Sequence, residues 1–431
     1  MNEKPMKDIY SVIDIGTQQV RVLIGQPDGG NRVSVLGVGL APAEGIDENG
    51  VANIERLVYA IQRALHTASQ QSGIILRKVW VVVNHIHMRG EETQAIITFP
   101  HPEHEIGLAD LERLRRQAVQ RPSPAEMELI HVIPQSYDLD HRRGIRDPLG
   151  MTGIRLEGHF YLVYAPQTHL TMLRRCFQRL QLEIEGFIAR PVAAAEVFLS
   201  REHKGSGAAL LYLGTHSTGI VLYSGGILRR LAILPLGGYH VTADIREMLR
   251  YILLPQAEEL KIQQGVAFAS RVSENEILRL RLSTHTEPIE VSRHTLARVI
   301  QARLEETMVF VAREIEQAGL LGKLYGGIHL AGGGALMPEI ETLVEYVLGE
   351  RAYRVQVGHV LGRGVVSTVD TPRMAGALAT LYLVPILREF MPPLTSPSAK
   401  ENPSAKTKAP FLNKVRSFLE SSLKLPQDLI D

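Results

Sequence analysis

The sequence predicts an α/β protein built from two similar halves, with a smaller α+β segment inserted into the first half. An apolar strand, a turn containing glycine and hydroxyl groups, and a second apolar strand occur near residue 16 and again near residue 214. Each pair is followed by a third strand, at Arg32–Leu40 and at Ile227–Leu234, and such a matched layout is typical of an internal duplication. The length of 431 residues agrees with two or more folding units, because single cores stop growing near ~250–300 residues.

The composition is that of an ordinary globular protein, with 45% apolar residues, 22% charged residues and a net charge of +1. This charge gives no general attraction to polyanions, so we expect no nucleic-acid partner. The single cysteine, Cys176, excludes an intramolecular disulfide and fits a reducing compartment. The N-terminal residues lack the apolar segment of a secretory signal, and no stretch approaches the roughly 18 apolar residues of a transmembrane helix. We therefore expect a cytoplasmic location.

The first half opens with an apolar run that ends at Gly16 and Thr17, followed by a second apolar run over Val20–Ile24. Apolar residues at helical spacing predict a helix over Ile54–Ser69, and a β-branched run predicts a strand over Val79–Val83 that is buried on both faces. After the inserted segment, the patterns predict two helices and a strand between them, at Leu170–Leu182, Glu183–Ala189 and Pro191–Leu199.

The inserted segment runs from residue 85 to residue 164, where histidine, proline and charged residues become frequent. A helix is predicted over Leu108–Gln120, and strands over His131–Leu139 and Ile154–Tyr164. Histidines 85, 87, 101 and 104 have spacings that suit a metal, but no cysteine or carboxylate set completes a site. We therefore interpret these histidines as surface or packing residues.

The second half begins with the strands Ala208–Leu213 and Gly219–Tyr223 on either side of the turn at Gly214–Thr218. The remaining patterns predict five helices and two strands. The helices are Thr242–Tyr251, Gln256–Gln264, Thr295–Ala318, Pro338–Leu348 and Pro372–Leu383, and the strands are Gly327–Leu330 and Arg354–Val357.

Three turns suggest a site for a phosphorylated ligand. Asp14 stands beside Gly16 and Thr17, and backbone N–H groups in such a turn can point at a phosphate while a carboxylate holds a hydrated Mg²⁺. The turn at Gly214–Thr218 and the glycines after Leu330 occupy similar positions at strand ends. Together the three turns predict one nucleotide in a cleft between the halves. The alternatives are an ordinary hairpin at Asp14 and a tight strand-to-helix connection at Ala331–Ala335.

The sequence resembles the actin-like ATPase superfamily and, within it, the FtsA family of bacterial cell-division proteins. SVIDIGTQQVRVLIG resembles the first phosphate motif, and HVIPQSYDLD and DPLGMTGIRLEGHFYLV resemble segments of the inserted subdomain 1C. The match covers about residues 8–390 and the tail. The resemblance implies an actin-like, two-lobed α/β fold of duplicated RNase H-like units. The implied subdomains are 1A over 1–84, 165–203 and 364–390, 1C over 85–164, 2A over 204–240 and 305–363, and 2B over 241–304. A disordered linker over 391–408 and an amphipathic helix over 409–425 would follow.

The resemblance also implies ATP and Mg²⁺ as ligands. QAEELKIQQG is similar to the helix that contacts adenosine, and HLAGGGALMPEIETLVEYVLG is similar to the adenosine glycine motif. The metal would be held through Asp14. The implied cofactor-binding residues are Asp14, Gly16, Thr17, Gln18, Gly214, Thr215, Glu258, Lys261, Gly332, Gly333 and Gly334.

The second phosphate motif departs from the pattern of the superfamily. In LLYLGTHSTGIVLYSGG, Tyr212 stands where an Asp is expected, Thr215 and His216 stand in the expected glycine run, and Gly219 replaces a second Asp. The lost carboxylate removes an anchor for a metal's water shell, and the added side chains obstruct backbone approach to a γ-phosphate. We therefore expect nucleotide binding with weak or absent hydrolysis.

The tail is a second candidate site. Six apolar residues form one face of a predicted helix, flanked by lysine and arginine, which suits the surface of an anionic membrane. The alternative is docking on the protein's own body or on a partner, and the acidic end of the chain weakens the membrane signal. The predicted membrane-binding residues are Phe411, Leu412, Val415, Phe418, Leu419 and Leu423.

Arg303 lies in a segment similar to the part of subdomain 2B that receives the acidic C-terminal peptide of the tubulin-like protein FtsZ. The alternative is a solvated helix charge. The resemblance implies a peripheral protein at the cytoplasmic face of the inner membrane, at the division septum, which anchors FtsZ filaments, polymerises head to tail and binds other division proteins. Alternatives are an adaptor of another membrane assembly such as PilM, a sugar kinase or Hsp70-type ATPase, and a nucleotide-free scaffold of the same fold.

Overall fold

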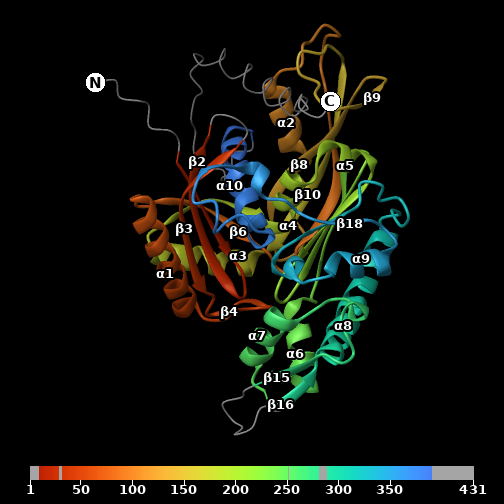
Figure 1. Ribbon diagram of the computed structural model, residues 1–431. Helices are drawn as coiled ribbons and strands as arrows, with labels where there is room; N and C mark the ends of the chain where they lie inside the picture. The colour runs from red at the N-terminus through yellow and green to blue at the C-terminus, as the bar shows by residue number, and fades with distance from the viewer. Residues whose placement is uncertain (1–8, 29–31, 251, 281–288, 391–431) are drawn as a thin grey trace. The chain divides into compact units, whose positions relative to one another are not determined.

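The computed structural model describes residues 9–28, 32–250, 252–280 and 289–390 (Figure 1), all within one unit that ends at Phe390. The predicted linker over 391–408 and the predicted terminal helix over 409–425 lie outside the described residues. The described residues form three larger sheets and two small hairpins.

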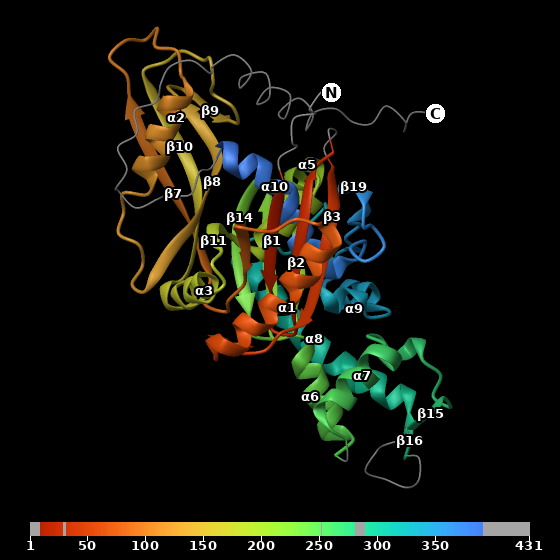
Figure 2. The ribbon, with the colours of Figure 1, turned by 90° about the vertical axis from the view of Figure 1, so that its left-hand side faces the viewer.

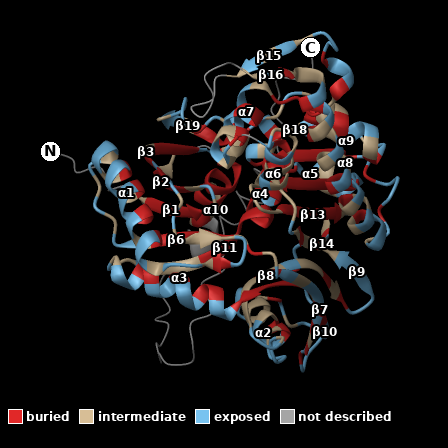
Figure 3. Ribbon diagram, turned by 90° about the horizontal axis from the view of Figure 1, so that it is seen from below, coloured by how far each residue is buried: buried red, intermediate tan, exposed pale blue. Residues whose placement is uncertain are grey.

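The first half is a six-stranded sheet in the order β11-β6-β1-β2-β3-β19. All six residues of β1 are buried, so this strand forms the centre of the sheet (Figure 3). β1 is antiparallel to β2 and parallel to β6, as expected for a hairpin followed by a crossover. The strands are β1 (Tyr10–Ile15), β2 (Gln19–Pro27), β3 (Val33–Pro42), β6 (Lys78–Val83), β11 (Glu183–Ala189) and β19 (Leu361–Gly364).

The second half is a five-stranded sheet that repeats this layout in the order β14-β13-β12-β17-β18. β12 is antiparallel to β13 and parallel to β17, so β14-β13-β12-β17-β18 corresponds to β3-β2-β1-β6-β11. The internal duplication predicted from two matched turns is therefore confirmed. The strands are β12 (Ala208–Leu213), β13 (Thr218–Ser224), β14 (Ile227–Leu234), β17 (Ile328–Ala331) and β18 (Ala352–Arg354).

Two helices lie between the sheets of the two halves. α10 (Ala375–Phe390) packs on β1 and β2, α4 (Arg190–Phe198) packs on β12 and β13, and the two helices pack on each other. On the other face of the first sheet, α1 (Ile54–Ser72) packs on β2 and β3 (Figure 2). The short hairpin of β4 (Ile46–Asp47) and β5 (Gly50–Val51) precedes α1, and α3 (Gln167–Arg179) packs beside it.

The inserted segment is a four-stranded antiparallel sheet in the order β7-β10-β8-β9, covered by α2. Its own core includes the fully buried Leu114, Phe160 and Leu162. The helix and the two long strands predicted here are present, whereas β7 and β9 were not predicted. The elements are β7 (Arg89–Thr98), α2 (Leu108–Ala118), β8 (Met127–Leu139), β9 (Arg142–Ile145) and β10 (Arg155–Pro166).

A helical segment of the second half forms the lower end of Figure 1, with a separate apolar core around Val241, Ile245 and Leu296. α8 extends from this core to the second sheet, where it contacts β13, β14 and α9. The elements of this segment are α6 (Gly238–Met248), α7 (Leu254–Gln264), β15 (Ile277–Leu280), β16 (Ile289–Ser292) and α8 (Arg293–Gln317). The helices α5 (Arg201–Ser206) and α9 (Ile340–Leu348) pack against the second sheet.

Several predicted boundaries are wrong, and the backbone explains two of them. α6 begins at Gly238 because the N–H of Gly238 donates to the carbonyl of Gly214 and docks the helix start on the second turn. α9 begins at Ile340 because a 3₁₀ turn follows the glycines and Glu339 then adopts φ +62°. β18 ends at Arg354, its last pairing with β17, rather than extending to residue 357.

Gly39 sets how closely α1 approaches the sheet, which gives a stability prediction. A Cβ at Gly39 would lie 1.8 Å from the carbonyl oxygen of Ala64 in α1, a position no atom can occupy. Gly39→Ala should therefore displace the helix and lower the free energy of unfolding by about 1–3 kcal/mol, the usual cost of overpacking. Urea denaturation measures this difference. Gly205→Ala is the control, because nothing lies within 4 Å of a Cβ there, and equal stability of the two variants would contradict the prediction.

Candidate functional site

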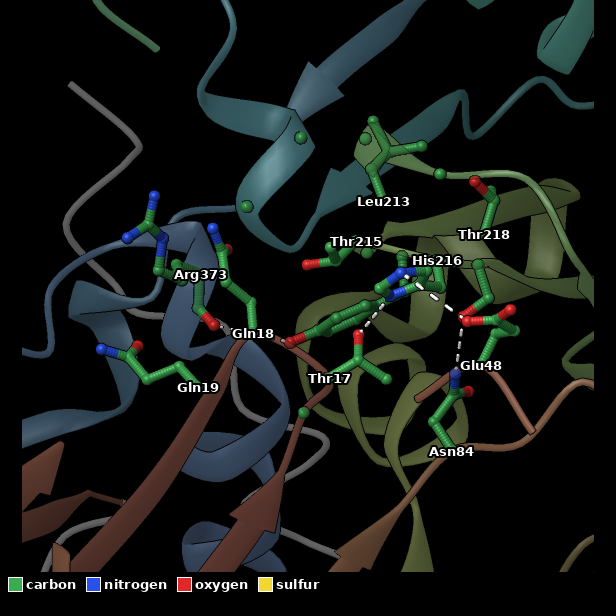
Figure 4. Close-up of a pocket in the computed structure, with 18 of the residues that line it drawn as sticks. Thr17, Gln18, Gln19, Glu48, Asn84, Leu213, Thr215, His216, Thr218 and Arg373 are labelled. Atoms are coloured by element: carbon green, nitrogen blue, oxygen red, sulfur yellow. Dashed lines mark hydrogen bonds and ion pairs between the residues drawn. The ribbon is translucent and has the colours of Figure 1, made fainter. Parts of the chain in front are cut away.

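A pocket lies at the seam between the two halves, where the β1–β2 turn, the β12–β13 turn and the glycine turn after β17 meet (Figure 4). Most of the predicted cofactor-binding residues line it, although they come from widely separated parts of the sequence. They are Gly16, Thr17, Gln18, Gly214, Thr215, Glu258, Lys261, Gly333 and Gly334. The predicted convergence of three turns in one cleft is therefore observed.

Gly332 is absent from the pocket lining and has a structural reason to be glycine. Its φ of +88° disfavours other residues, and a Cβ there would lie 2.5 Å from the carbonyl oxygen of Leu213. Its N–H donates to the carbonyl of Pro372. Gly332 therefore allows close approach of two backbone segments, and the next two glycines face the pocket.

Asp14 is also absent from the lining, because it is completely buried behind two arginines. Arg190 donates to Oδ1 through Nε at 2.9 Å and Nη2 at 2.6 Å, and Arg21 donates to Oδ2 through Nη1 at 3.2 Å. Nη2 of Arg190 also donates to the carbonyl of Ile15 at 2.7 Å. A carboxylate with both oxygens engaged in this way does not fit the predicted role of holding a hydrated Mg²⁺.

The two arginines are functional candidates that the sequence interpretation missed. Arg21 interrupts the apolar strand Val20–Ile24, and Arg190 stands in an otherwise apolar stretch at the start of α4. Charged residues are seldom buried unless they are paired, so each was a signal for a hidden partner. Both arginines line the pocket, and the guanidinium of Arg190 lies 5.7 Å from the ring centre of Tyr212.

On the opposite side of the pocket, Lys261 and Glu258 of α7 form a buried polar group with α6. Nζ of Lys261 donates to Glu258 at 2.7 Å, to the hydroxyl of Thr242 at 2.9 Å and to the carbonyl of Gly238 at 2.8 Å. Burial lowers the pKa of Lys261, and the charge of Glu258 acts against that shift. All three ammonium protons are used, so Lys261 fixes the orientation of Glu258.

Side chains from the two halves meet directly across the pocket. Nδ1 of His216 lies 2.8 Å from the hydroxyl of Thr17, and Nε2 lies 3.9 Å from Glu48 (Figure 4). Asn84 donates to the hydroxyl of Ser217 at 2.9 Å. The ring of His216 stacks on Tyr239, and burial lowers the pKa of the imidazole. The side chain in the expected glycine run therefore bridges the two turns.

Gln18 makes a further contact across the pocket by donating to Oε1 of Glu258 at 3.4 Å. This hydrogen bond joins the first turn to the helix that was predicted to contact adenosine. The contacts across the pocket therefore involve hydroxyl, amide, imidazole and carboxylate groups, whereas guanidinium groups form another part of its wall.

Arg303 lies outside the pocket lining, on α8. Its Nε and Nη2 donate to the two oxygens of Asp244 at 2.6 and 3.0 Å, and Nη1 pairs with Glu306. The side chain retains 27% of its exposure, so it is accessible as well as paired. The predicted membrane-binding residues, 411–423, lie outside the described residues.

The histidines behave largely as packing residues. His85 is buried against His169 at the pocket wall, and His104 pairs with Asp110. Among the residues that the structure describes, no group of three His, Cys, Asp or Glu side chains could hold a metal ion. Cys176 is buried. Within the same described ranges, no helix has the length and apolar character needed to cross a bilayer.

Sequence comparison places the chain among bacterial division proteins. Residues 86–164 match a family described as "SHS2 domain inserted in FTSA", and residues 209–379 match "Cell division protein FtsA". The chain is 32% identical to the cell division protein FtsA of Bacillus subtilis over 79% of this chain and 77% of that protein. It is 28% identical to FtsA of Pseudomonas aeruginosa over 95% of this chain and 97% of that protein.

Structure comparison identifies the fold. The PilM-PilN type IV pilus biogenesis complex matches with a TM-score of 0.63 and 17% identity, covering 88% of this chain and 99% of that chain. MreB5 of Spiroplasma citri bound to ADP matches with a TM-score of 0.53 and 12% identity, covering 88% and 97%. These likenesses confirm the predicted actin-like fold.

Buried His169 at the pocket wall predicts a pH dependence of stability. Burial, and to a smaller extent the charge of His85, lowers the pKa of His169 from 6.5 to about 4, and its Nδ1 has no partner among the described residues. Between pH 6.5 and 4 the unfolded chain therefore binds more protons at this residue, so the unfolding free energy falls as the pH falls.

Urea denaturation at pH 7 and pH 5 tests this. We expect His169→Gln to reduce the wild-type loss of stability by up to about 2 kcal/mol, since each pKa unit corresponds to about 1.4 kcal/mol. His66→Gln, at an exposed position on α1, should keep the wild-type loss. An unchanged loss in His169→Gln would show that His169 is protonated in the folded protein.

Proposed function

The chain belongs to the FtsA family of cell division proteins, and on this premise we propose that it anchors FtsZ filaments to the cytoplasmic face of the inner membrane at the division septum. It also helps to assemble other division proteins there. The similarity to FtsA along nearly the whole chain carries this proposal. An actin-fold adaptor such as PilM is the second candidate, because the fold alone is shared with that complex.

The pocket between the halves binds ATP in this proposal. Backbone N–H groups of the turns at Gly16 and Gly214 face the phosphates, while Gly333, Gly334 and α7 face the adenosine. Glycine turns at strand ends suit this role because they admit a ligand close to the backbone. MreB5, a neighbour of the same fold, has been solved bound to ADP and to AMPPNP.

Hydrolysis is slow or absent in this proposal. The second turn, Gly214–Thr218, contributes hydroxyls and an imidazole but no carboxylate. The buried carboxylate of Asp14 is committed to two guanidinium groups, so it is not free to accept a proton from an attacking water. Nucleotide therefore acts as a structural ligand that sets the relation of the two halves.

Polymerisation strengthens membrane attachment. We assign subdomain 1C to residues 85–164 and subdomain 2B to residues 241–304, which lie at opposite ends of the described unit in Figure 1. This separation supports the proposed head-to-tail contact. A single amphipathic helix binds a membrane weakly, whereas a polymer presents many copies at once. The tail helix over 409–425 supplies one weak attachment per subunit.

Arg303 is the proposed contact for the acidic FtsZ peptide. Its guanidinium is held in a bidentate pair by Asp244, so an incoming carboxylate has to displace Asp244. The hydrogen bonds to Asp244 raise the pKa of Arg303, and burial acts against that shift. The site is therefore preorganised for a carboxylate, with Asp244 as the internal competitor.

Fluorescence anisotropy with a labelled C-terminal peptide of FtsZ tests this assignment. Arg303→Gln should weaken binding by about tenfold or more, the value of a charge-assisted bidentate pair. Asp244→Asn should strengthen binding, because the competitor is removed. Arg298→Gln, at an exposed position of the same helix, should leave the affinity unchanged. Equal weakening in both arginine variants would indicate general electrostatics, and no binding by the wild type would favour the PilM-like alternative.

Co-sedimentation with vesicles tests the tail. Val415→Glu/Leu419→Glu changes the predicted apolar face, whereas Asn413→Glu/Ser417→Glu adds the same charge on the opposite face. We expect the first pair to release the protein from anionic vesicles as fully as deletion of residues 410–431, and the second pair to retain most binding. Equal release by both pairs would mean that attraction to the lipid charge, rather than apolar insertion, holds the tail.

A further inference from the structure

We propose that this pocket binds its nucleotide without a divalent cation, because the guanidinium groups of Arg190 and Arg21 occupy the place beside Asp14 where a hydrated metal would be held. The ligand is then the free nucleoside phosphate anion. This inference rests on the proposed nucleotide binding and concerns the chemistry of the same site.

The charged groups lie in a fixed order from the interior to the pocket. Asp14 has no exposed surface and is absent from the pocket lining, whereas Arg21 and Arg190 belong to the lining. The arginines therefore stand between the carboxylate and the space for a ligand. A hydrated Mg²⁺ needs a carboxylate oxygen that faces its water shell, and here both oxygens accept hydrogen bonds from guanidinium.

Arg190 is held in one position by several contacts. Besides its two bonds to Asp14, Nη2 donates to the carbonyl of Ile15, and the guanidinium lies over the ring of Tyr212. Its aliphatic part fills the space beside Gly376, where a Cβ would lie 2.5 Å from Cγ of Arg190. The side chain is therefore held by contacts from three different segments, and moving it away would leave the charge of Asp14 half paired.

The wall beside Asp14 also carries a net positive charge. One carboxylate and two guanidinium groups leave a net charge of +1 at this wall, and a divalent cation would be repelled there. Arg373 lines the same pocket and has no carboxylate within ion-pair distance among the described residues. Nε of Arg21 is buried without a hydrogen-bond partner in the described part of the chain. The excess positive charge is complementary to phosphate.

The chemistry of arginine makes this substitution effective. A guanidinium group keeps its charge at all physiological pH values and presents several N–H donors in one plane, which match phosphate oxygens. It supplies the neutralising charge of a cation without requiring a water shell. It does not lower the pKa of a bound water as a metal does, and this agrees with a ligand that is held rather than hydrolysed.

Equilibrium binding of a fluorescent ATP analogue to the full chain, with excess Mg²⁺ or with EDTA, tests the inference. We expect the two dissociation constants to agree within about threefold, which is a small difference in affinity. Binding that is more than about tenfold weaker in EDTA would overturn the inference while leaving the proposed nucleotide site in place. No binding in either condition would overturn the nucleotide site and the inference together.

Two variants test the role of the arginine. Arg190→Gln frees Oδ1 of Asp14. This variant should therefore bind the ATP analogue at least about fivefold more tightly with Mg²⁺ than with EDTA. The double variant Arg190→Gln/Asp14→Asn lacks both the guanidinium and the carboxylate charge, so its affinity should be the same with Mg²⁺ and with EDTA. Arg373→Gln should weaken binding equally in both conditions. A metal effect of the same size in the single and the double variant would overturn the assignment, and circular dichroism establishes that each variant is folded.

If Arg190→Gln does not fold, Arg190→Lys serves in its place. Lysine keeps one charge on Asp14 but lacks the fork that engages Oδ1 and Ile15 together. We then expect Arg190→Lys to bind the nucleotide more weakly than the wild type does. As in the wild type, its affinity should not depend on Mg²⁺. A strong Mg²⁺ requirement in Arg190→Lys would contradict the proposal, because a cation would then be needed although the charge is retained.

Discussion

The buried ion group of Asp14, Arg21 and Arg190 is the constraint on which the seam of this molecule depends. Asp14 lies in β1, Arg21 lies in β2 and Arg190 begins α4, so three elements are joined at one point. A buried carboxylate is costly unless it is fully paired, and removing one partner of such a group costs more than the group contributes when intact. Because α4 lies between the two sheets, the ion group fixes the position of the helix around which both halves pack.

The inserted sheet holds this seam from a second side. The N–H of Ala189, next to Arg190, donates to Nε2 of His131 in β8 at 2.9 Å. Burial lowers the pKa of His131 to about 4, so the imidazole is neutral near pH 7 and can accept this bond. The same sheet reaches the second half, where Leu231 donates to the hydroxyl of Tyr161 at 2.8 Å. The insertion therefore contacts both halves and restrains their relative movement.

Local patterns were sufficient to predict most of the fold, because β1, β2, β12 and both hairpin turns are encoded within a few residues. β7 was missed because its exposed face carries Glu92 and Gln94, and Glu91 interrupts the apolar residues of the other face. β19 is a short edge strand with two glycines and carries almost no pattern. The pocket residues were predicted through motifs, but the environment of Asp14 was not, because Arg190 lies 176 residues away in the sequence. Such contacts follow from tertiary packing and have no local signature.

In this pocket, the buried charges and the contacts between the two halves are made by different residues. This arrangement affects the affinity for a ligand. The guanidinium groups at the wall are fixed by Asp14, while the contacts across the mouth are made by Thr17, His216 and Gln18. In the tautomer whose Nδ1 accepts from the hydroxyl of Thr17, a phosphate that accepts a hydrogen bond from Thr17 has to replace His216 at that hydroxyl. Ligand affinity is therefore reduced by the free energy of separating these side chains, and the same free energy couples occupancy to the spacing of the two halves. In the proposed function, this coupling transmits the presence of nucleotide to both halves without hydrolysis.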